Sequence, residues 1–152
     1  MSLTAVTVNS GRHLICAVTA SESSESCAVS VSVDSVTVAR GEGDDFELAF
    51  QLLRAELEAL GLHLLCNRYR RDAFVTSLSR QMSGGLGCYL VEPRRPVDPG
   101  RIVDCLGPAR ASDVVSKEEA DAFIAGWRSR PPLLLLPILL WRSWRERVRG
   151  QT

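Results

Sequence analysis

Histidine is scarce in this chain, with only His13 and His63 among 152 residues. Nucleophilic catalysis needs a nucleophile, a base and a group that orients the base. His63 and Cys66 stand three positions apart in a predicted strand, so their side chains point to opposite faces and cannot form a dyad. A tertiary contact between His63 and Ser77 is a pairing that stays open. The sequence therefore names no catalytic residue and favours a non-enzymatic function.

Motifs for metal binding are also lacking. The cysteines form no C-x-x-C pair, and together with two histidines they make no recognisable ligand set. We therefore predict no metal and no cofactor. Every cysteine has apolar neighbours, which predicts buried free thiols in a reducing cytoplasm. The five are Cys16, Cys27, Cys66, Cys88 and Cys105.

Neither a signal peptide nor a membrane span is indicated. The N-terminus has one early arginine and no long apolar core, unlike a secretory signal. The most apolar run, Leu133–Trp141, is too short to cross a bilayer and contains a proline. These features predict a cytoplasmic protein.

Lysine is nearly absent, because Lys117 is the single lysine among 18 basic residues. The preference for arginine fits a GC-rich coding genome and suggests a bacterial source. The net charge is zero, but residues 1–60 hold nine acids and three arginines, whereas residues 61–152 hold nine acids and fifteen bases. We expect the two halves to neutralise each other in the fold. Few aromatic residues accompany the arginines, which argues against nucleic-acid binding.

The order of predicted elements is three strands, a helix, further strands and a second helix. Period-two apolar patterns bounded by turn residues predict strands at 3–8, 13–20, 27–39, 62–67, 87–92 and 101–106. The alternation changes phase at Asp34-Ser35, which predicts a bulge or a short hairpin. We therefore predict an α+β fold, a two-layer sandwich with two main helices on a mostly antiparallel sheet of five or six strands. It comprises one domain, 1–130, and a tail, 131–152.

Both helices carry capping signals. Asp44 and Glu47 predict a capping box for the first helix, and Gly61 predicts its end. Its apolar stripe consists of Phe46, Phe50, Leu53, Leu57 and Leu60. Ser116 and Glu119 repeat the box for a second helix ending near residue 130. The buried face of that helix is predicted to be Ala120, Phe123, Ile124 and Trp127.

The connection 68–85, RYRRDAFVTSLSRQMSGG, is long for a compact domain, and long connections are often functional. Its arginines, hydroxyls and glycine pair suit a small anionic or phosphate-bearing ligand. The residues predicted to bind it are Arg71, Ser77, Arg80, Gly84 and Gly85. The alternative is structural: a short helix over 73–82 packs Phe74, Leu78 and Met82 inward, and the arginines pair with the acidic first half.

Residues 46–129 also carry a motif pattern along this connection. The pattern consists of Glu56 to Gly61, Cys66-Asn67, Arg71-Asp72, Ser77, Arg80, Met82, Gly84-Gly85 and Tyr89. It resembles a family of small bacterial α+β proteins in which a helix ending in acidic residues and glycine leads into a strand and then an Arg/Gly loop. This chain differs at Thr76, where a proline is usual, and around Leu78-Ser79. The resemblance implies the fold and the importance of the loop, and no reaction.

The tail 131–152 is the second candidate surface. Pro137 suits the first position of a helix, and basic residues surround an apolar face. The predicted partner-binding residues are Leu140, Trp141, Trp144 and Val148. Such a segment either packs on its own sheet or docks on another protein or a second copy, and a membrane surface is a weaker alternative. The sequence thus favours an accessory, regulatory or immunity-type interaction protein over a binder of, or enzyme on, a small anion.

Overall fold

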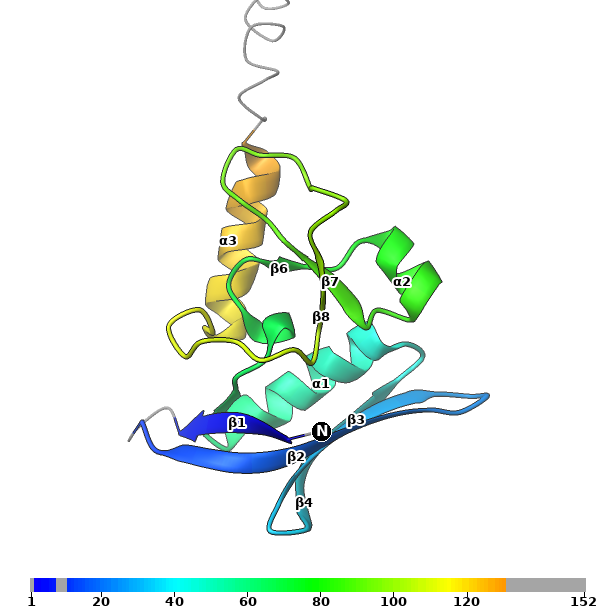
Figure 1. Ribbon diagram of the computed structural model, residues 1–152, viewed down its shortest axis with the longest axis vertical. Coiled ribbons are helices and arrows are strands. Elements are labelled where there is room, and N and C mark those ends of the chain that lie inside the picture. Colours follow the sequence, from blue (N-terminus) through cyan, green and yellow to red (C-terminus); the bar gives the residue numbers. More distant parts are fainter. Residues whose placement is uncertain (1, 8–10, 131–152) are drawn as a thin grey trace, which may run out of the picture.

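The computed structural model describes residues 2–7 and 11–130, and its architecture confirms the predicted α+β class (Figure 1). Five strands form an antiparallel sheet in the order β4-β3-β2-β1-β5. They are β1 (Ser2–Thr7), β2 (His13–Glu22), β3 (Cys27–Val33), β4 (Val36–Gly43) and β5 (Leu62–Leu64). A second antiparallel sheet, in the order β6-β7-β8, contains β6 (Ala73–Phe74), β7 (Gly87–Leu90) and β8 (Ile102–Asp104).

The helices pack between and beside these two sheets. They are α1 (Phe46–Ala59), the 3₁₀ helix η1 (Asn67–Tyr69), α2 (Ser77–Ser83) and α3 (Lys117–Ser129). Figure 1 shows α1 lying across one face of the five-stranded sheet, with the small sheet, α2 and α3 on the other side of α1. The two main helices predicted from sequence are α1 and α3. The predicted tail helix lies outside the described residues.

The phase change at Asp34-Ser35 is a hairpin between β3 and β4. Asp34 and Ser35 both have positive φ, 49° and 67°, as a two-residue type I′ turn requires. The register also shifts between Val31 and Ser32, which is a β-bulge or a similar irregularity. Of the two alternatives expected at Asp34-Ser35, the short hairpin is therefore present, and the register shift lies before it in β3.

The capping box predicted for α1 is wrong by one residue. Asp45, not Asp44, is the N-cap, and its Oδ1 accepts a hydrogen bond of 2.9 Å from the Leu48 amide. Glu47 then stands at the second helical position, one short of the position from which it would bond back to the cap. The Glu47 carboxylate therefore pairs with Arg68 rather than with the cap. The predicted end is confirmed, since Gly61 has a φ of 69°.

Helix α1 approaches the sheet closely because β4 carries small residues below it. Phe50, Leu53 and Leu57 are fully buried on this side of the helix. A Cβ on Gly41 of β4 would stand 1.9 Å from the backbone oxygen of Ala49, so no larger residue fits there. Leu60, predicted to belong to the apolar stripe, is 57% exposed because it follows the last helical residue.

Helix α3 begins as its capping box predicts, because the Ser116 side chain accepts a hydrogen bond from the Glu119 amide. Its predicted buried face is only partly covered. Ala120 is buried, whereas Phe123, Ile124 and Trp127 are half-buried. One side of α3 is therefore only partly covered by the rest of the described fold.

Among the described residues, the longest helices are too short and too polar to cross a membrane.

Candidate functional site

The connection 68–85 is largely folded. It contains η1, β6 and α2, separated by short turns. The structural alternative, a helix over 73–82, is right about the helix and wrong about its bounds and orientation. Phe74 belongs to strand β6 and packs against Trp127 of α3, with ring centroids 5.4 Å apart. The helix begins only at Ser77, because Thr76 caps it by accepting a hydrogen bond of 3.1 Å from the Ser79 amide.

The one buried side chain of helix α2 is a serine, and its two large apolar side chains are exposed. Leu78 and Met82 are 57% and 79% exposed, whereas Ser79 is 3% exposed. The Ser79 hydroxyl donates to the Gly87 carbonyl of β7, and the Ser83 hydroxyl donates to the Ser79 carbonyl at 2.9 Å. Because the Ser79 side of the helix is held to β7, Leu78 and Met82 face solvent. The predicted inward packing of these two residues is therefore wrong.

Two arginines of the connection pair with acids of the first half of the chain, as the structural alternative predicts. Arg68 binds both carboxylate oxygens of Glu47, with Nε 2.8 Å from Oε2. Arg80 Nε donates to Asp45 Oδ2 at 2.7 Å. Asp45 thus accepts from its own helix and from Arg80 at once. Within the described residues, the anion beside Arg80 is the chain's own carboxylate.

The residues predicted to bind an anion fall into separate places. Arg80, Gly84 and Gly85 gather at the beginning of α1. Arg71 lies instead against α3, with its guanidinium 5.2 Å from the ring centroid of Phe123. Ser77 is exposed at the first position of α2. Binding of an external anion by this set stays a prediction.

The glycine pair serves the packing of α1. Gly84 and Gly85 have φ values of 59° and 94°, which side chains other than glycine adopt poorly. The Gly84 carbonyl accepts a hydrogen bond of 2.9 Å from the Phe46 amide. A Cβ on Gly85 would stand 3.0 Å from the Glu47 amide nitrogen. Close approach to the first turn of α1 therefore explains both glycines.

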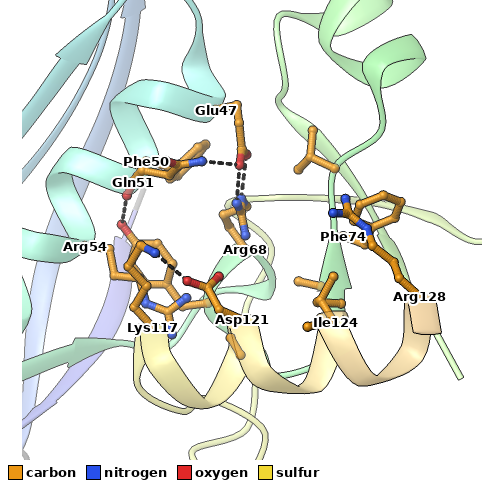
Figure 2. Close-up of a pocket in the computed structure, with 15 residues that line it drawn as sticks. Glu47, Phe50, Gln51, Arg54, Arg68, Phe74, Lys117, Asp121, Ile124 and Arg128 are labelled. Carbon is orange, nitrogen blue, oxygen red and sulfur yellow. Dashed lines mark hydrogen bonds and ion pairs between the residues drawn. The ribbon is translucent and has the colours of Figure 1, made fainter. Parts of the chain in front are cut away.

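A cavity of about 330 Å³ lies between α1 and α3. The backbone from η1 to β6 forms its third wall. Figure 2 shows the side chains of Glu47 and Arg68 pointing toward each other beside the cavity, while Lys117 and Asp121 pair along α3. Six of the fifteen lining residues are charged, and cations exceed acids among them. The charged residues are Arg54, Arg68, Lys117, Arg128, Glu47 and Asp121.

The Glu47–Arg68 pair is mostly buried, with side-chain exposures of 11% and 14%. Burial lowers the pKa of the Arg68 guanidinium, but the adjacent Glu47 carboxylate outweighs burial, so the pKa stands above its ordinary value. Gln51 Nε2 also donates to Glu47 at 2.8 Å. Both charges are therefore fixed in position and neutralised by each other.

Arg54 is held just as firmly at the next turn of α1. Its guanidinium lies 5.1 Å from the ring centroid of Tyr69, and it donates to Glu58 at 2.9 Å and to the Val115 carbonyl. The Tyr69 hydroxyl in turn donates to the Phe50 carbonyl at 2.9 Å. Burial raises the pKa of Tyr69 well above its ordinary value. This corner of the cavity is rigid and neutral.

Arg128 differs from the other cations of the cavity. Its guanidinium lies 4.8 Å from the ring centroid of Phe74. Within the described part of the chain it has neither an ion pair nor a hydrogen-bond partner. The sequence analysis did not predict the cavity or its charges. One signal of a polar surface on α1 was present, because Arg54 interrupts the apolar stripe between Phe50 and Leu57.

All five cysteines are buried with free thiols, as predicted. Three of them, Cys66, Cys88 and Cys105, are fully buried beside Arg68. Burial raises the pKa of the Cys66 thiol to about 12. The hydrogen bond with Cys88, together with burial, raises the pKa of the Cys105 thiol. These thiols pack the core rather than face a ligand.

The predicted partner-binding residues of the tail, Leu140, Trp141, Trp144 and Val148, lie outside the described residues. Comparison with models of protein families gave no match, and no curated protein matches the chain. The similarity to a family of small bacterial proteins therefore stays an interpretation of the motif around residues 56–89.

Proposed function

We propose that this chain is a non-enzymatic interaction protein that binds another protein chain through the outer face of α2. The observation that carries the proposal is that this helix buries a serine and exposes both of its large apolar side chains. Ser79 is buried against β7 of the small sheet, and Leu78 and Met82 face solvent. An apolar helix face in water is an ordinary site for association, because burial of each large side chain contributes about 1.5–3 kcal/mol.

A further exposed apolar side chain lies near α2. Ile102 of β8 is 49% exposed. A Cβ on Gly87 would stand 2.8 Å from the Ile102 side chain and 3.4 Å from the Ser79 hydroxyl, so Ile102 lies beside the helix. Helix α2 also stands at the periphery of the fold in Figure 1. A partner can reach it without displacing another element.

The proposal keeps the connection 68–85 as a contact surface but changes which residues make the contact. Leu78 and Met82 replace the arginines and glycines, because Arg68, Arg70 and Arg80 have acidic partners within the chain. The tail 131–152 is the second proposed contact surface, from its sequence alone. A bacterial accessory, regulatory or immunity-type role follows from the same sequence features.

A double substitution, Leu78→Ser with Met82→Ser, tests this function. Because both side chains are exposed, the free energy of unfolding should change by less than about 0.5 kcal/mol each. Self-association, followed by sedimentation velocity, or capture of a specific protein from cell extract, followed by quantitative mass spectrometry, should fall at least tenfold. Leu60→Ser is the matched control, since Leu60 is as exposed as Leu78 and lies at the far end of α1. Equal association by the double variant and the parent would refute the proposal.

A further inference from the structure

The charges around the cavity between α1 and α3 cancel except at one point. Glu47 neutralises Arg68, and Asp121 neutralises Lys117. Arg54 is paired with Glu58, immediately outside the cavity. After this pairing one positive charge remains, on Arg128. The cavity thus has the electrostatic complement of a single negative charge.

Arg128 is positioned to bind such a negative charge. The Arg128 guanidinium lies over the Phe74 ring, and its N–H groups have no hydrogen-bond partner in the described residues. A guanidinium binds a carboxylate by two parallel hydrogen bonds, which are stronger than hydrogen bonds between neutral groups. Phe74 is itself supported from the side by Trp127. A bidentate bond to Arg128 therefore needs little ordering of the protein.

The part of the cavity next to Arg128 is apolar. One side is lined by Phe74, the last residue of β6, and by Val75, which follows it. The other side is lined by Ile124 and Ala125 of α3. Figure 2 shows Phe74 and Ile124 on either side of this end of the cavity. The volume of about 330 Å³ corresponds to roughly ten water molecules. The space fits an apolar body of one ring or a short chain.

We propose that the cavity between α1 and α3 binds a small monocarboxylate with an apolar body. The carboxylate accepts two hydrogen bonds from Arg128, and the body lies between Phe74 and Ile124. Phosphate fits poorly, because a second negative charge would meet no free cation and its hydrated surface would meet apolar walls. The site shares no residue with the anion set predicted from sequence and does not depend on the face of α2.

Titration of the full-length chain with 3-phenylpropionate, observed by the backbone amide spectrum, tests the proposal. Saturable shifts are expected in residues 73–75 and 120–128. 3-Phenylpropanamide, which has the same body without the charge, should bind at least tenfold more weakly. Inorganic phosphate should cause no saturable shift there. Equal binding of acid and amide, or saturable binding of phosphate at these residues, would overturn the proposal.

Two pairs of variants locate the site. Arg128→Ala should weaken binding of 3-phenylpropionate at least tenfold, whereas Arg130→Ala, two residues further along and outside the cavity, should leave it unchanged. Ala125→Phe should fill the cavity and abolish binding, whereas Ala122→Phe should not. All four positions are exposed, so each variant should fold. Binding that survives both Arg128→Ala and Ala125→Phe would place the ligand elsewhere.

A free acid and the carboxyl end of a peptide share this chemistry. Acetyl-alanyl-phenylalanine and its C-terminal amide distinguish them. Tighter binding of the peptide acid than of 3-phenylpropionate, with loss in Arg128→Ala, would identify a chain terminus as the ligand, and the reverse order would identify a small metabolite. If neither acid saturates the site, the proposal is wrong.

Discussion

Gly41→Ala should destabilise the protein far more than the addition of one methyl group normally does. The added Cβ would stand 1.9 Å from the Ala49 oxygen and 2.5 Å from the Leu53 nitrogen, both backbone atoms of α1. Neither can rotate away, so α1 must move by about 1.5 Å to restore ordinary contact. That movement opens a gap above Phe50 and Leu53, which are fully buried. We expect a loss of about 3 kcal/mol or more in the free energy of unfolding.

Gly126→Ala is the matched control for this prediction. Gly126 lies inside α3, and a Cβ there would meet no atom within 4 Å. The same substitution should therefore stabilise the protein by about 0.5–1 kcal/mol, because alanine favours the helix. Urea unfolding followed by circular dichroism measures both variants. A loss below about 0.5 kcal/mol for Gly41→Ala, with an unchanged urea dependence, would refute the close packing of α1 on β4.

Three further predictions concern the core, the thiols and the Arg/Gly connection. Leu53→Ala should cost about 2–5 kcal/mol, because Leu53 is fully buried, and an unchanged unfolding midpoint would contradict the packing of α1 on the sheet. The thiols should react slowly with Ellman's reagent at pH 8; the pKa of Cys66, raised to about 12 by burial, should make stability fall as the pH rises from about 9 toward 12, since the unfolded thiol ionises first. Rapid native-state reaction, or stability that rises over this pH range, would contradict the burial. Arg80→Ala should cost less than about 1 kcal/mol, because its pair with Asp45 is half-exposed; a thermal shift with phosphate that disappears in this variant would instead establish anion binding at the connection.

The sequence predicts the elements whose signals are local. The apolar stripe of α1, the capping box at Ser116 and the hairpin at Asp34-Ser35 each depend on residues within one or two turns of each other. The sequence assigns the cap of α1 to the wrong residue because Asp44 and Asp45 are chemically equivalent, and only the structure shows that Asp45 accepts from the Leu48 amide. Local patterns decide the type of element better than its first residue.

The orientation of α2 could not be predicted because it depends on tertiary contacts. Spacing alone places Leu78 and Met82 on one face of a helix, and burial of that face is the usual outcome. Here hydrogen bonds from Ser79 to β7 select the opposite face. A seven-residue helix with only two large apolar side chains can pack with either its apolar face or its Ser79 face against the sheet.

The cavity between α1 and α3 was equally hidden, since its walls come from segments that are far apart in the sequence. Glu47 and Arg68 are 21 residues apart, and Arg128 comes from the other end of the described chain. Only the positions of these residues in the fold show which charges cancel and which one remains. The separation of acidic and basic halves anticipates the pairs Glu47–Arg68 and Asp45–Arg80, whereas Arg54–Glu58 and Lys117–Asp121 each form within one half.

Photocrosslinking from α2 tests the proposed interaction most directly. A photoreactive benzoylphenylalanine replaces Met82, which is 79% exposed, or Leu60 as the control, in the cells that naturally produce the chain. Our account predicts that illumination joins position 82 to a second protein chain, either a copy of this one or a different protein, and that position 60 gives no such adduct. An absence of adduct at position 82, or the same adduct from both positions, would contradict it.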